Sequence, residues 1–283
     1  MTAPKKILIT GATGNQGGSL AAALAGTEFE LQGMTRNPDS PAAEALREKG
    51  VTIIQGDLDD AASLKKALTG VWGVYAVQNT WEAGVEQEEA QGKRFATLAR
   101  EAGVQHFVYG SVGSAHRATG VPHFDNKWRV EETVRELGFP SHVIVRPVFY
   151  MENLLSPWFL NGDTIYMALK PDTVLQMIAV QDIGKYSARA FTEAGRLNGR
   201  EIDVAGDALT MPDAARLLSE GLGRPIKFVE IPIAEVRKNS EDIALMLEWF
   251  ERVGYEADIP ALEKEFGFKP TTFAAWAAAQ RGK

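Results

Sequence analysis

The residues with the clearest chemical meaning are the glycines of one short segment, Gly11-Ala12-Thr13-Gly14-Asn15-Gln16-Gly17-Gly18. The segment follows an apolar run, Ile7–Thr10, that predicts a buried strand, and it opens a run of small apolar residues, Ser19–Ala25, that predicts a helix. Glycines at such a turn let a pyrophosphate approach backbone N–H groups at the positive end of the helix. The alternative, a glycine-rich turn that only packs helix on strand, would explain Gly17 but not all four glycines. The segment therefore predicts a dinucleotide-binding loop.

The end of the second predicted strand, Phe29–Thr35, indicates which dinucleotide is bound. Arg36 and Asn37 follow this strand, and the first acidic residue comes only at Asp39. An acidic residue at this place holds the ribose 2′-hydroxyl of NAD, whereas an arginine accommodates the 2′-phosphate of NADP. Arg36 can pair with a phosphate and stack on adenine. We therefore expect NADP(H) rather than NAD(H); the alternative is an exposed arginine that merely follows a strand.

Two further polar segments follow the third and fourth predicted strands. Asp57, next to Leu58, can accept a hydrogen bond from the adenine amino group, or it can cap the helix that begins near Asp59. Gln78-Asn79-Thr80 follows the fourth strand, at the carboxyl edge of the sheet where folds of this kind bind ligands.

The elements that must position these residues alternate between short apolar runs and helical stretches. The predicted strands are Ile7–Thr10, Phe29–Thr35, Val51–Gln55, Val71–Val77, His106–Tyr109 and His142–Val145, and the predicted helices are Ser19–Ala25, Pro41–Lys49, Ala61–Leu68, Glu82–Ala102 and Phe124–Leu137. This alternation predicts an α/β fold with a Rossmann-type doubly wound parallel sheet over residues 1–150.

After about residue 150 the pattern changes. Residues 151–178 are rich in aromatics and methionine and predict irregular structure. The elements expected beyond them are helices at Val180–Phe191, Ser240–Arg252 and Thr272–Gln280 and strands at Glu201–Val204 and Lys227–Ile231. We expect residues 151–283 to form a smaller C-terminal α+β substrate domain, with the chain weaving between the two domains. The apolar stripe of Ser240–Arg252 fits either a core or a partner surface.

The composition excludes several classes of protein. The chain has 283 residues, a formal net charge of −7, 45% hydrophobic and 24% charged residues, which is typical of a globular protein and not of a disordered or fibrous one. A chain without cysteine has no disulfide and no thiolate nucleophile, and its histidines lack metal-ligand spacing, so we expect no metal. The acidic balance argues against nucleic-acid binding. No apolar run approaches the roughly 18 residues of a membrane-spanning helix, so we expect no membrane association. The absence of cysteine fits a reducing compartment, and we expect a cytoplasmic location.

Taken together, the motifs GATGNQGG, TRNP, QGDLDD, NTWE, HFDNK and RPVFYMENLLS resemble the NmrA-like family of atypical short-chain dehydrogenase/reductases. The resemblance is specific to about residue 160 and looser beyond it. It implies an NADP-binding domain, a small C-terminal domain and a pocket between them. The cofactor contacts it implies are Gly11 to Gln16 for the pyrophosphate, Arg36 for the 2′-phosphate, Asp57 and Leu58 for adenine, Gln78, Asn79, Thr80 and Lys127 for the nicotinamide ribose, and Tyr150, Met151 and Asn153 for the nicotinamide end. Gln78 stands where the family usually has a threonine.

Short-chain dehydrogenases typically carry a Tyr-x-x-x-Lys motif, whose tyrosine donates a proton and whose lysine binds the ribose. This chain keeps the spacing but has His123 in place of the tyrosine, with Lys127 four residues later. Residues four apart lie on one face of a helix, so both can address the same ligand as catalytic residues. Three roles stay open for His123: proton donor, substrate-pocket contact, or structural residue at the start of the helix. The alternative for Lys127 is a solvated helix lysine.

The remaining candidates concern the substrate. Ser111 follows the fifth strand, where related enzymes place a serine that polarises the substrate carbonyl. Trp81, Phe149 and Trp158 occur in segments expected at the crevice, where they form either an apolar pocket or an interdomain core. A pocket would suit an apolar, planar substrate such as a quinone, enone, imine or aromatic metabolite. Two functions follow: an NADPH-dependent reductase of a small molecule, or a non-catalytic NADP(H)-binding sensor. The associations left open are a homodimer and a regulatory protein partner.

Overall fold

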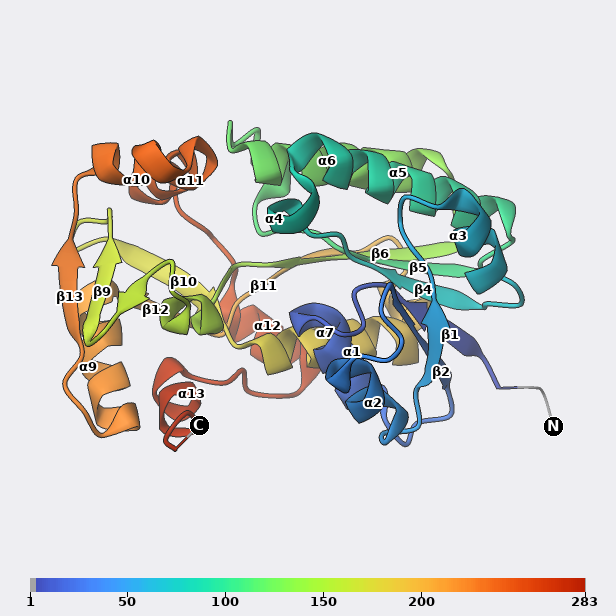
Figure 1. The fold of residues 1–283 in the computed structure, drawn as a ribbon, viewed down its shortest axis with the longest axis horizontal. Helices are drawn as coiled ribbons and strands as arrows, with labels where there is room; N and C mark the ends of the chain where they lie inside the picture. The colour runs from blue at the N-terminus through green and yellow to red at the C-terminus, as the bar shows by residue number, and fades with distance from the viewer. Residues whose placement is uncertain (1–3, 283) are drawn as a thin grey trace. The chain divides into compact units, whose positions relative to one another are not determined.

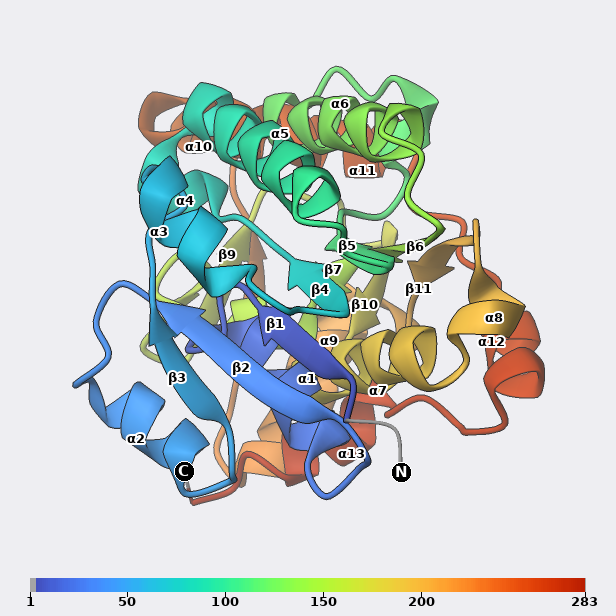
Figure 2. The same cartoon turned by 90° about the vertical axis from the view of Figure 1, so that its right-hand side faces the viewer.

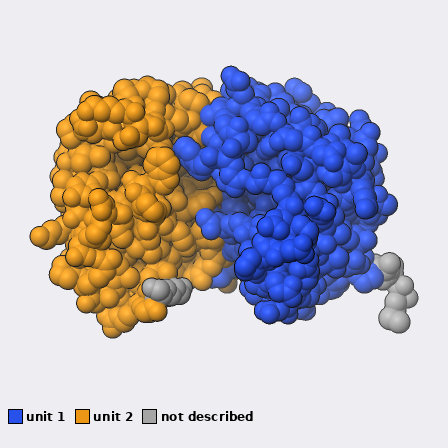
Figure 3. All heavy atoms as spheres, in the orientation of Figure 1, with its two compact units in different colours: residues 1–111, 126–146, 183–202 blue, residues 112–125, 147–182, 203–283 orange. Residues whose placement is uncertain are grey.

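The computed structural model describes residues 4–282, which divide into two compact units (Figure 3). The first unit contains the chain up to Ser111, then Asn126–Arg146 and Ile183–Ile202. The second unit contains Val112–Asp125, Pro147–Asp182 and the chain from Asp203 onward. Each unit has its own hydrophobic core. Among the described residues, no helix combines the length and the apolarity needed to cross a membrane.

The first unit is built on a seven-stranded sheet with the order β11-β6-β5-β4-β1-β2-β3 (Figures 1 and 2). Its strands are β1 (Lys6–Ile9), β2 (Glu30–Thr35), β3 (Thr52–Gln55), β4 (Gly73–Ala76), β5 (His106–Gly110), β6 (Ser141–Pro147) and β11 (Glu201–Val204). The pairings of β1 with β2 and β4, of β2 with β3, and of β5 with β4 and β6 are all parallel. The strand order reverses between β1 and β4, where doubly wound sheets bind their ligands. The predicted Rossmann-type sheet is confirmed.

Helices cover both faces of this sheet. They are α1 (Asn15–Leu24), α2 (Pro41–Arg47), α3 (Ala61–Ala67), α4 (Thr80–Ala83), α5 (Val85–Glu101), α6 (Pro122–Glu136), α7 (Val180–Thr192) and α8 (Ala194–Leu197). Helices α5 and α6 lie side by side over one face, and α1, α2 and α7 lie on the other (Figures 1 and 2). Phe95 of α5 and Val134 of α6 are buried in the core with Phe107 of β5. Helices α1 and α7 approach so closely that a Cβ added at Gly184 would lie 2.2 Å from Ser19 Oγ.

The single helix predicted over Glu82–Ala102 is wrong in one respect. Gly84 separates α4 from α5, because its φ of 84° and ψ of 162° lie outside the helical region. This left-handed φ favours glycine. Asn79 then caps α4 by accepting a hydrogen bond from the Trp81 N–H. The break gives the segment after β4 its own short helix.

The second unit combines two small sheets with helices, as the α+β expectation required. One sheet has the order β12-β10-β7 and the other β13-β9-β8. The strands are β7 (Phe149–Tyr150), β8 (Leu160–Asn161), β9 (Thr164–Met167), β10 (Val174–Ile178), β12 (Asp207–Thr210) and β13 (Lys227–Glu230), and the helices are α9 (Met211–Leu222), α10 (Ile233–Asn239), α11 (Glu241–Arg252), α12 (Ile259–Phe266) and α13 (Phe273–Ala278). Two 3-10 turns complete the chain, η1 (Ala115–Arg117) and η2 (Met151–Leu155).

Two expectations for this unit need correction. Residues 151–178 are not irregular, since they contain η2 and strands β8, β9 and β10. The structure contains helices α9, α10 and α12, which were not predicted from the sequence. For the stripe of α11, the core alternative is the correct one: Ile243, Leu247 and Phe250 are all buried.

Candidate functional site

The glycine segment forms a tight turn between β1 and α1. Gly11 has a φ of 57°, which favours glycine, and a Cβ there would lie 2.9 Å from the side chain of Val77. Gly14 N–H donates to the Gly11 carbonyl oxygen at 2.9 Å. A Cβ added at Gly17 would lie 2.4 Å from the same oxygen, so the close packing of this turn excludes any side chain there.

The N-terminus of α1 differs from those of its neighbours in having no side-chain cap. Ser40, Asp60 and Asn79 cap the following helices through side-chain oxygens, whereas Gly14 makes no such bond, and within residues 4–282 the first turn of α1 holds no acidic residue. The first amides of a helix have no carbonyl partner and carry partial positive charge. The N–H groups at the start of α1 therefore fit an anion such as a pyrophosphate.

The other residues of the segment are fixed in different ways. Ala12 is buried and Thr13 is exposed. Gln16 Oε1 accepts a hydrogen bond from Tyr75 Oη at 2.6 Å. This bond ties the first turn of α1 to β4, the strand on the other side of the sheet's switch point.

Arg36 extends from the end of β2 and forms an ion pair within the first unit. Its Nη2 donates to Glu82 Oε2 at 2.5 Å, and the Arg36 side chain remains 66% exposed. Asn79 Nδ2 donates to the other oxygen of Glu82 at 3.2 Å. Since a guanidinium has five N–H donors, the pair with Glu82 leaves Arg36 able to bind a phosphate as well.

The cap of α3 is Asp60, not Asp57. Asp60 Oδ1 accepts a hydrogen bond from Ala62 N–H at 2.9 Å, whereas Asp57 Oδ1 accepts one from Asp59 N–H within the preceding turn. The capping alternative for Asp57 is therefore wrong. Leu58 packs against the core of the first unit. A contact of these two residues with adenine stays a prediction.

A buried polar cluster lies beyond β4 and β5, and we call it the Glu88 cluster. All its members belong to the first unit: Thr80, Asn126 and Lys127 contact Glu88, the Tyr109 ring lies 6.0 Å from Lys127 Nζ, and Gln78 Oε1 lies 3.1 Å from the position of a Cβ at Gly92, one turn after Glu88. Lys127 Nζ donates to Glu88 Oε1 at 2.6 Å, and Asn126 Nδ2 donates to Glu88 Oε2 at 2.7 Å. The Thr80 hydroxyl also donates to Glu88 Oε2. Because Lys127 is only 8% exposed, the alternative of a solvated helix lysine is wrong.

Burial and the Glu88–Lys127 ion pair shift the pKa values of two groups in this cluster. Burial alone would raise the pKa of Glu88, but Lys127 and the hydrogen bonds from Thr80 and Asn126 lower that pKa below its usual value. Burial, together with the charge of Glu88, raises the pKa of Tyr109 well above its usual value. The cluster therefore holds a carboxylate, an ammonium and a neutral phenol.

Several buried polar atoms of the cluster have no hydrogen-bond partner among the described residues. They are both amide atoms of Gln78, the Tyr109 hydroxyl and Asn126 Oδ1. An unpaired buried polar group costs about 1–3 kcal/mol, so such groups indicate a polar ligand or solvent. The hydroxyl groups of a ribose are both donors and acceptors and fit these atoms. The chemistry of the turn before α1 and of this cluster suits the cofactor that the sequence predicts, and the individual contacts stay predictions.

Glu88 was not among the residues predicted for the site. Gln91, Gly92 and Phe95 lie three, four and seven residues after Glu88, and all three are buried, so Glu88 belongs to the buried stripe of α5. An acidic residue on the buried stripe of a helix requires a partner, and this signal could have identified it.

Ser111 is buried and its hydroxyl already has an acceptor. Ser111 Oγ donates to Glu131 Oε1 at 2.5 Å, and Arg146 donates to both oxygens of Glu131. The Ser111 proton thus points to Glu131 in this structure. The role of Ser111 in polarising a substrate carbonyl stays a prediction.

In the second unit, His123 forms a pair with Asp242 at the start of α11. His123 Nδ1 contacts Asp242 Oδ1, and the His123 backbone N–H donates to Asp242 Oδ2 at 3.1 Å. The pair joins the beginning of α6 to α11. It orients the ring so that Nδ1 faces the carboxylate.

The other predicted residues of the second unit differ in exposure. Phe149 and Met151 are buried in its core, where Phe149 packs against Phe159 and Phe250. Tyr150 is half-buried, and the Asn153 carbonyl oxygen accepts a hydrogen bond from Ser156 N–H. Trp158 is 63% exposed, and in the first unit Trp81 is 57% exposed. The two tryptophans are therefore surface side chains within their own units.

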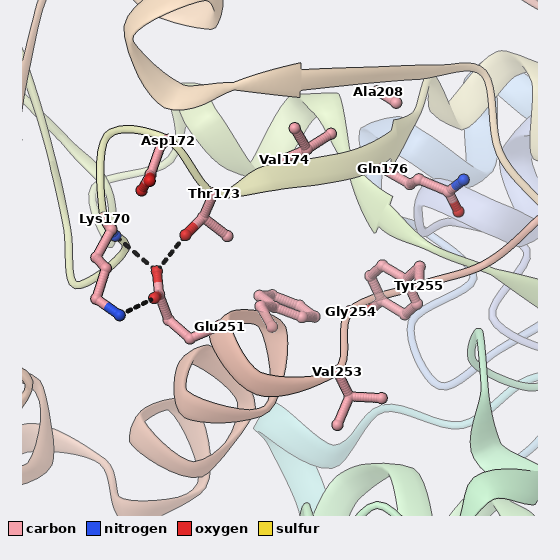
Figure 4. A pocket seen from close by; sticks show the side chains of 11 residues that line it. Lys170, Asp172, Thr173, Val174, Gln176, Ala208, Glu251, Val253, Gly254 and Tyr255 are labelled. Carbon is pink, nitrogen blue, oxygen red and sulfur yellow. Dashed lines mark hydrogen bonds and ion pairs between the residues drawn. The ribbon is translucent and has the colours of Figure 1, made fainter.

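A pocket of about 490 Å³ lies in the second unit (Figure 4). It is lined by Lys170, Asp172, Thr173, Val174, Gln176, Ala208, Phe250, Glu251, Val253, Gly254 and Tyr255. Glu251 accepts hydrogen bonds from the Lys170 backbone N–H and the Thr173 hydroxyl. No residue predicted for the site belongs to this lining.

Comparison with known proteins agrees with the fold and the motifs. The model of the NmrA-like family matches residues 3–277. A (4-alkanoyl-5-oxo-2,5-dihydrofuran-3-yl)methyl phosphate reductase of Streptomyces griseus is 30% identical over 285 residues, which cover 96% of each chain. Among solved structures, an NADPH-dependent quinone oxidoreductase of Escherichia coli complexed with NADPH is 25% identical, with a TM-score of 0.81 over 96% of this chain and 99% of that one.

A second similar solved structure is that of a transcriptional regulator. NmrA, a negative transcriptional regulator in complex with NADP, has a TM-score of 0.82 and 23% identity, over 99% of this chain and 96% of that one. The likeness to NmrA shows a shared fold. With the family match over nearly all of the chain, the resemblance predicted from the motifs is confirmed: this chain belongs to the NmrA-like family.

Proposed function

We propose that this protein binds NADP(H) and uses it to reduce a small apolar, planar molecule such as a quinone, enone, imine or aromatic metabolite. The main support for the proposal is the N-terminus of α1, which follows the Gly11 turn at the switch point of the sheet and has no side-chain cap. The solved complexes of the quinone oxidoreductase with NADPH and of NmrA with NADP support the choice of cofactor.

The cofactor contacts follow the course of the first unit. In this proposal the amides of Gly11 to Gly17 hold the pyrophosphate and Arg36 binds the 2′-phosphate. Asp57 and Leu58 contact the adenine, and Gln78, Asn79, Thr80 and Lys127 bind the nicotinamide ribose. Tyr150, Met151 and Asn153 remain our prediction for the nicotinamide end.

NADPH supplies a hydride when bound, and the protein's task is then to position the acceptor and provide a proton. His123 and Ser111 are the side chains we propose for the proton, with water as the third source. The reductase of Streptomyces griseus and the quinone oxidoreductase of Escherichia coli support a reductase within this family.

A second function is favoured by a specific observation. The two side chains that we propose for the proton are already engaged, His123 by Asp242 and Ser111 by Glu131. A protein with this arrangement can act as an NADP(H)-binding regulator that responds to the cofactor without turning over a substrate. In that case its partner is another protein.

The first experiment measures dissociation constants for NADPH and NADH by calorimetry. We expect NADPH to bind at least about tenfold tighter, since a charge-assisted contact contributes about 1.5–3 kcal/mol. Arg36→Ala should remove most of this preference, and Arg47→Ala, an exposed arginine of α2, should leave it unchanged. Equal dissociation constants in the unmodified protein would contradict the proposed cofactor site.

The second experiment separates reductase from regulator. NADPH oxidation is followed by absorbance against a panel of quinones, enones, aldehydes and imines. Turnover of any of them supports the reductase. Tight NADPH binding with no turnover across the panel favours the regulator.

A further inference from the structure

Glu88 is buried beside the lysine that the proposed function assigns to the cofactor. Its side chain is 1% exposed, yet it carries a carboxylate that accepts hydrogen bonds from three residues. Thr80 donates from α4, and Asn126 and Lys127 donate from α6. Glu88 itself belongs to α5, so one carboxylate joins three helices of the first unit.

Stability alone gives little reason for this arrangement. Removing two charges from water costs about as much as a buried pair returns, so such pairs are weak contributors to stability. Glu89, the next residue of α5, makes comparable contacts to Lys93 and Arg129 at the surface, at 2.7 Å and 2.6 Å. The buried pair has a different consequence: it fixes the position of Lys127 Nζ and gives this ammonium a counter-ion.

We propose that Glu88 is a positioning residue that holds the Lys127 ammonium, charged and in one place, for the ribose of the bound cofactor. This inference rests on the proposed function, in which Lys127 contacts that ribose. An ammonium has three N–H donors. Lys127 Nζ donates one of them to Glu88, and across residues 4–282 no second acceptor is found for it, so two remain for ribose hydroxyls.

The charges around Lys127 leave Glu88 as the anion that balances it. From β5, the Tyr109 ring lies 6.0 Å from Lys127 Nζ, and its hydroxyl stays neutral. From the same helix α6, Glu131 is paired with Arg146 at 2.5 Å. Glu88 is the ion-pair partner found for Lys127 within residues 4–282, so its removal would leave Lys127 as a buried cation without that counter-ion.

This balance predicts a signature in the pH dependence of binding. In Glu88→Gln, burial favours the neutral amine of Lys127 once the carboxylate is gone. A neutral amine makes a weaker hydrogen bond to ribose than an ammonium does. The affinity of Glu88→Gln for NADPH should therefore fall as the pH rises.

The test measures the dissociation constant of NADPH between pH 7 and 9, above the second pKa of a phosphate ester near about 6. We expect Glu88→Gln to lose about tenfold in affinity across this range, and the wild type to change by less than about threefold. The matched control is Glu89→Gln, which removes the same charge one residue along the same helix and should follow the wild type.

Two further variants separate position from charge. In a Lys127→Met background, Glu88→Gln should add no further loss and no pH dependence, because its effect acts through Lys127. Glu88→Asp keeps the negative charge, but its shorter side chain moves the carboxylate away from Lys127. This variant should therefore keep the flat pH profile of the wild type and bind NADPH several-fold more weakly. If Glu88→Gln does not fold, Glu88→Asp and Lys127→Met carry the test.

The outcomes distinguish this inference from the function on which it rests. A wild-type chain that does not bind NADPH refutes the proposed function. Tight binding by the wild type, with Glu88→Gln or Glu88→Asp indistinguishable from it at every pH, refutes the positioning role alone. A lower melting temperature of Glu88→Gln with unchanged NADPH affinity would show a merely structural carboxylate.

Discussion

Arg36 Nη2 donates a hydrogen bond to Glu82 Oε2 at 2.5 Å, so the arginine proposed to bind the 2′-phosphate already has an anionic partner. Both side chains are largely exposed, at 66% and 56%. An exposed pair of this kind contributes at most about 1 kcal/mol. The carboxylate nevertheless competes with a phosphate for the same guanidinium and repels it.

Glu82→Gln should therefore tighten NADPH binding by about two- to fivefold, because the competing charge is removed. NADH lacks the 2′-phosphate, so its affinity should change less. Calorimetry with both cofactors checks this, with Glu86→Gln, an exposed glutamate of α5, as the control. Weaker binding of NADPH by Glu82→Gln would mean that Glu82 orients Arg36 instead of opposing it.

Gly14→Val should abolish NADPH binding and leave the sheet folded. The φ of Gly14 is −99°, which valine adopts, so strain at a positive φ is not the reason. Its Cβ would lie 3.3 Å from the Gly11 carbonyl oxygen, and its methyl groups would occupy the space in front of the α1 amides.

The control for this variant is Gly195→Val. A Cβ at Gly195 of α8 meets no atom within 4 Å among the described residues, so the same substitution should leave NADPH affinity unchanged. Circular dichroism monitors folding of both variants. A Gly14→Val protein that keeps wild-type NADPH affinity would show that the loop does not hold the pyrophosphate.

His123→Ala should lower the free energy of unfolding by about 1–3 kcal/mol, since Oδ1 of the half-buried Asp242 loses its imidazole partner while the backbone N–H of residue 123 still donates to Oδ2. Asp242→Asn should cost a similar amount. Because the two residues act as one pair, the double variant should cost less than the sum of the single ones. Denaturant titrations of the four proteins measure this coupling, and strictly additive effects would contradict the pair.

His106 should make the protein less stable in mild acid. Burial lowers the pKa of His106 from 6.5 to about 4, and its ring bonds to Ser141 Oγ and the Ala190 carbonyl oxygen. The folded state therefore takes up this proton less readily than the unfolded state. The stability is fully present above pH 6.5 and is lost as the pH falls toward 4.

The size of this effect is of the order of 3 kcal/mol between pH 7 and 4. His106→Gln keeps a hydrogen-bonding side chain but has no proton to take up. Its free energy of unfolding should fall less than that of the wild type over the same range. Parallel curves for the two proteins would mean that His106 is not responsible.

The first unit could be predicted because its signals are local. Each of its early strands is a short apolar run, and the residues that follow the strand, such as Arg36 after β2, already indicate the cofactor. The Glu88–Lys127 pair could not be predicted in this way. Its members are 39 residues apart, and they meet only because α5 and α6 lie side by side on one face of the sheet.

The second unit was harder for two different reasons. Strand β9 pairs with β13, far along the chain, so Thr164 meets Lys227 through contacts that no local pattern contains. Helix α9, in contrast, carries ordinary signals: Thr210 caps it, a proline stands in its first turn, and Gly223 ends it in the left-handed region. Helix α9 was not predicted, although these local signals mark both of its ends.

The interleaving of the two units has a consequence for synthesis. Three segments of one unit alternate with three of the other, so the chain passes between them five times. Because residues leave the ribosome in order, a nascent chain that has reached β6 still lacks α7 and β11. Until Ile202 emerges, β6 is the edge of an incomplete sheet, and its buried residues present a surface to which other chains can pair. The edge of β6 therefore stays unpaired during translation until β11 has been made, and no single division of the gene gives two halves that each encode a complete unit.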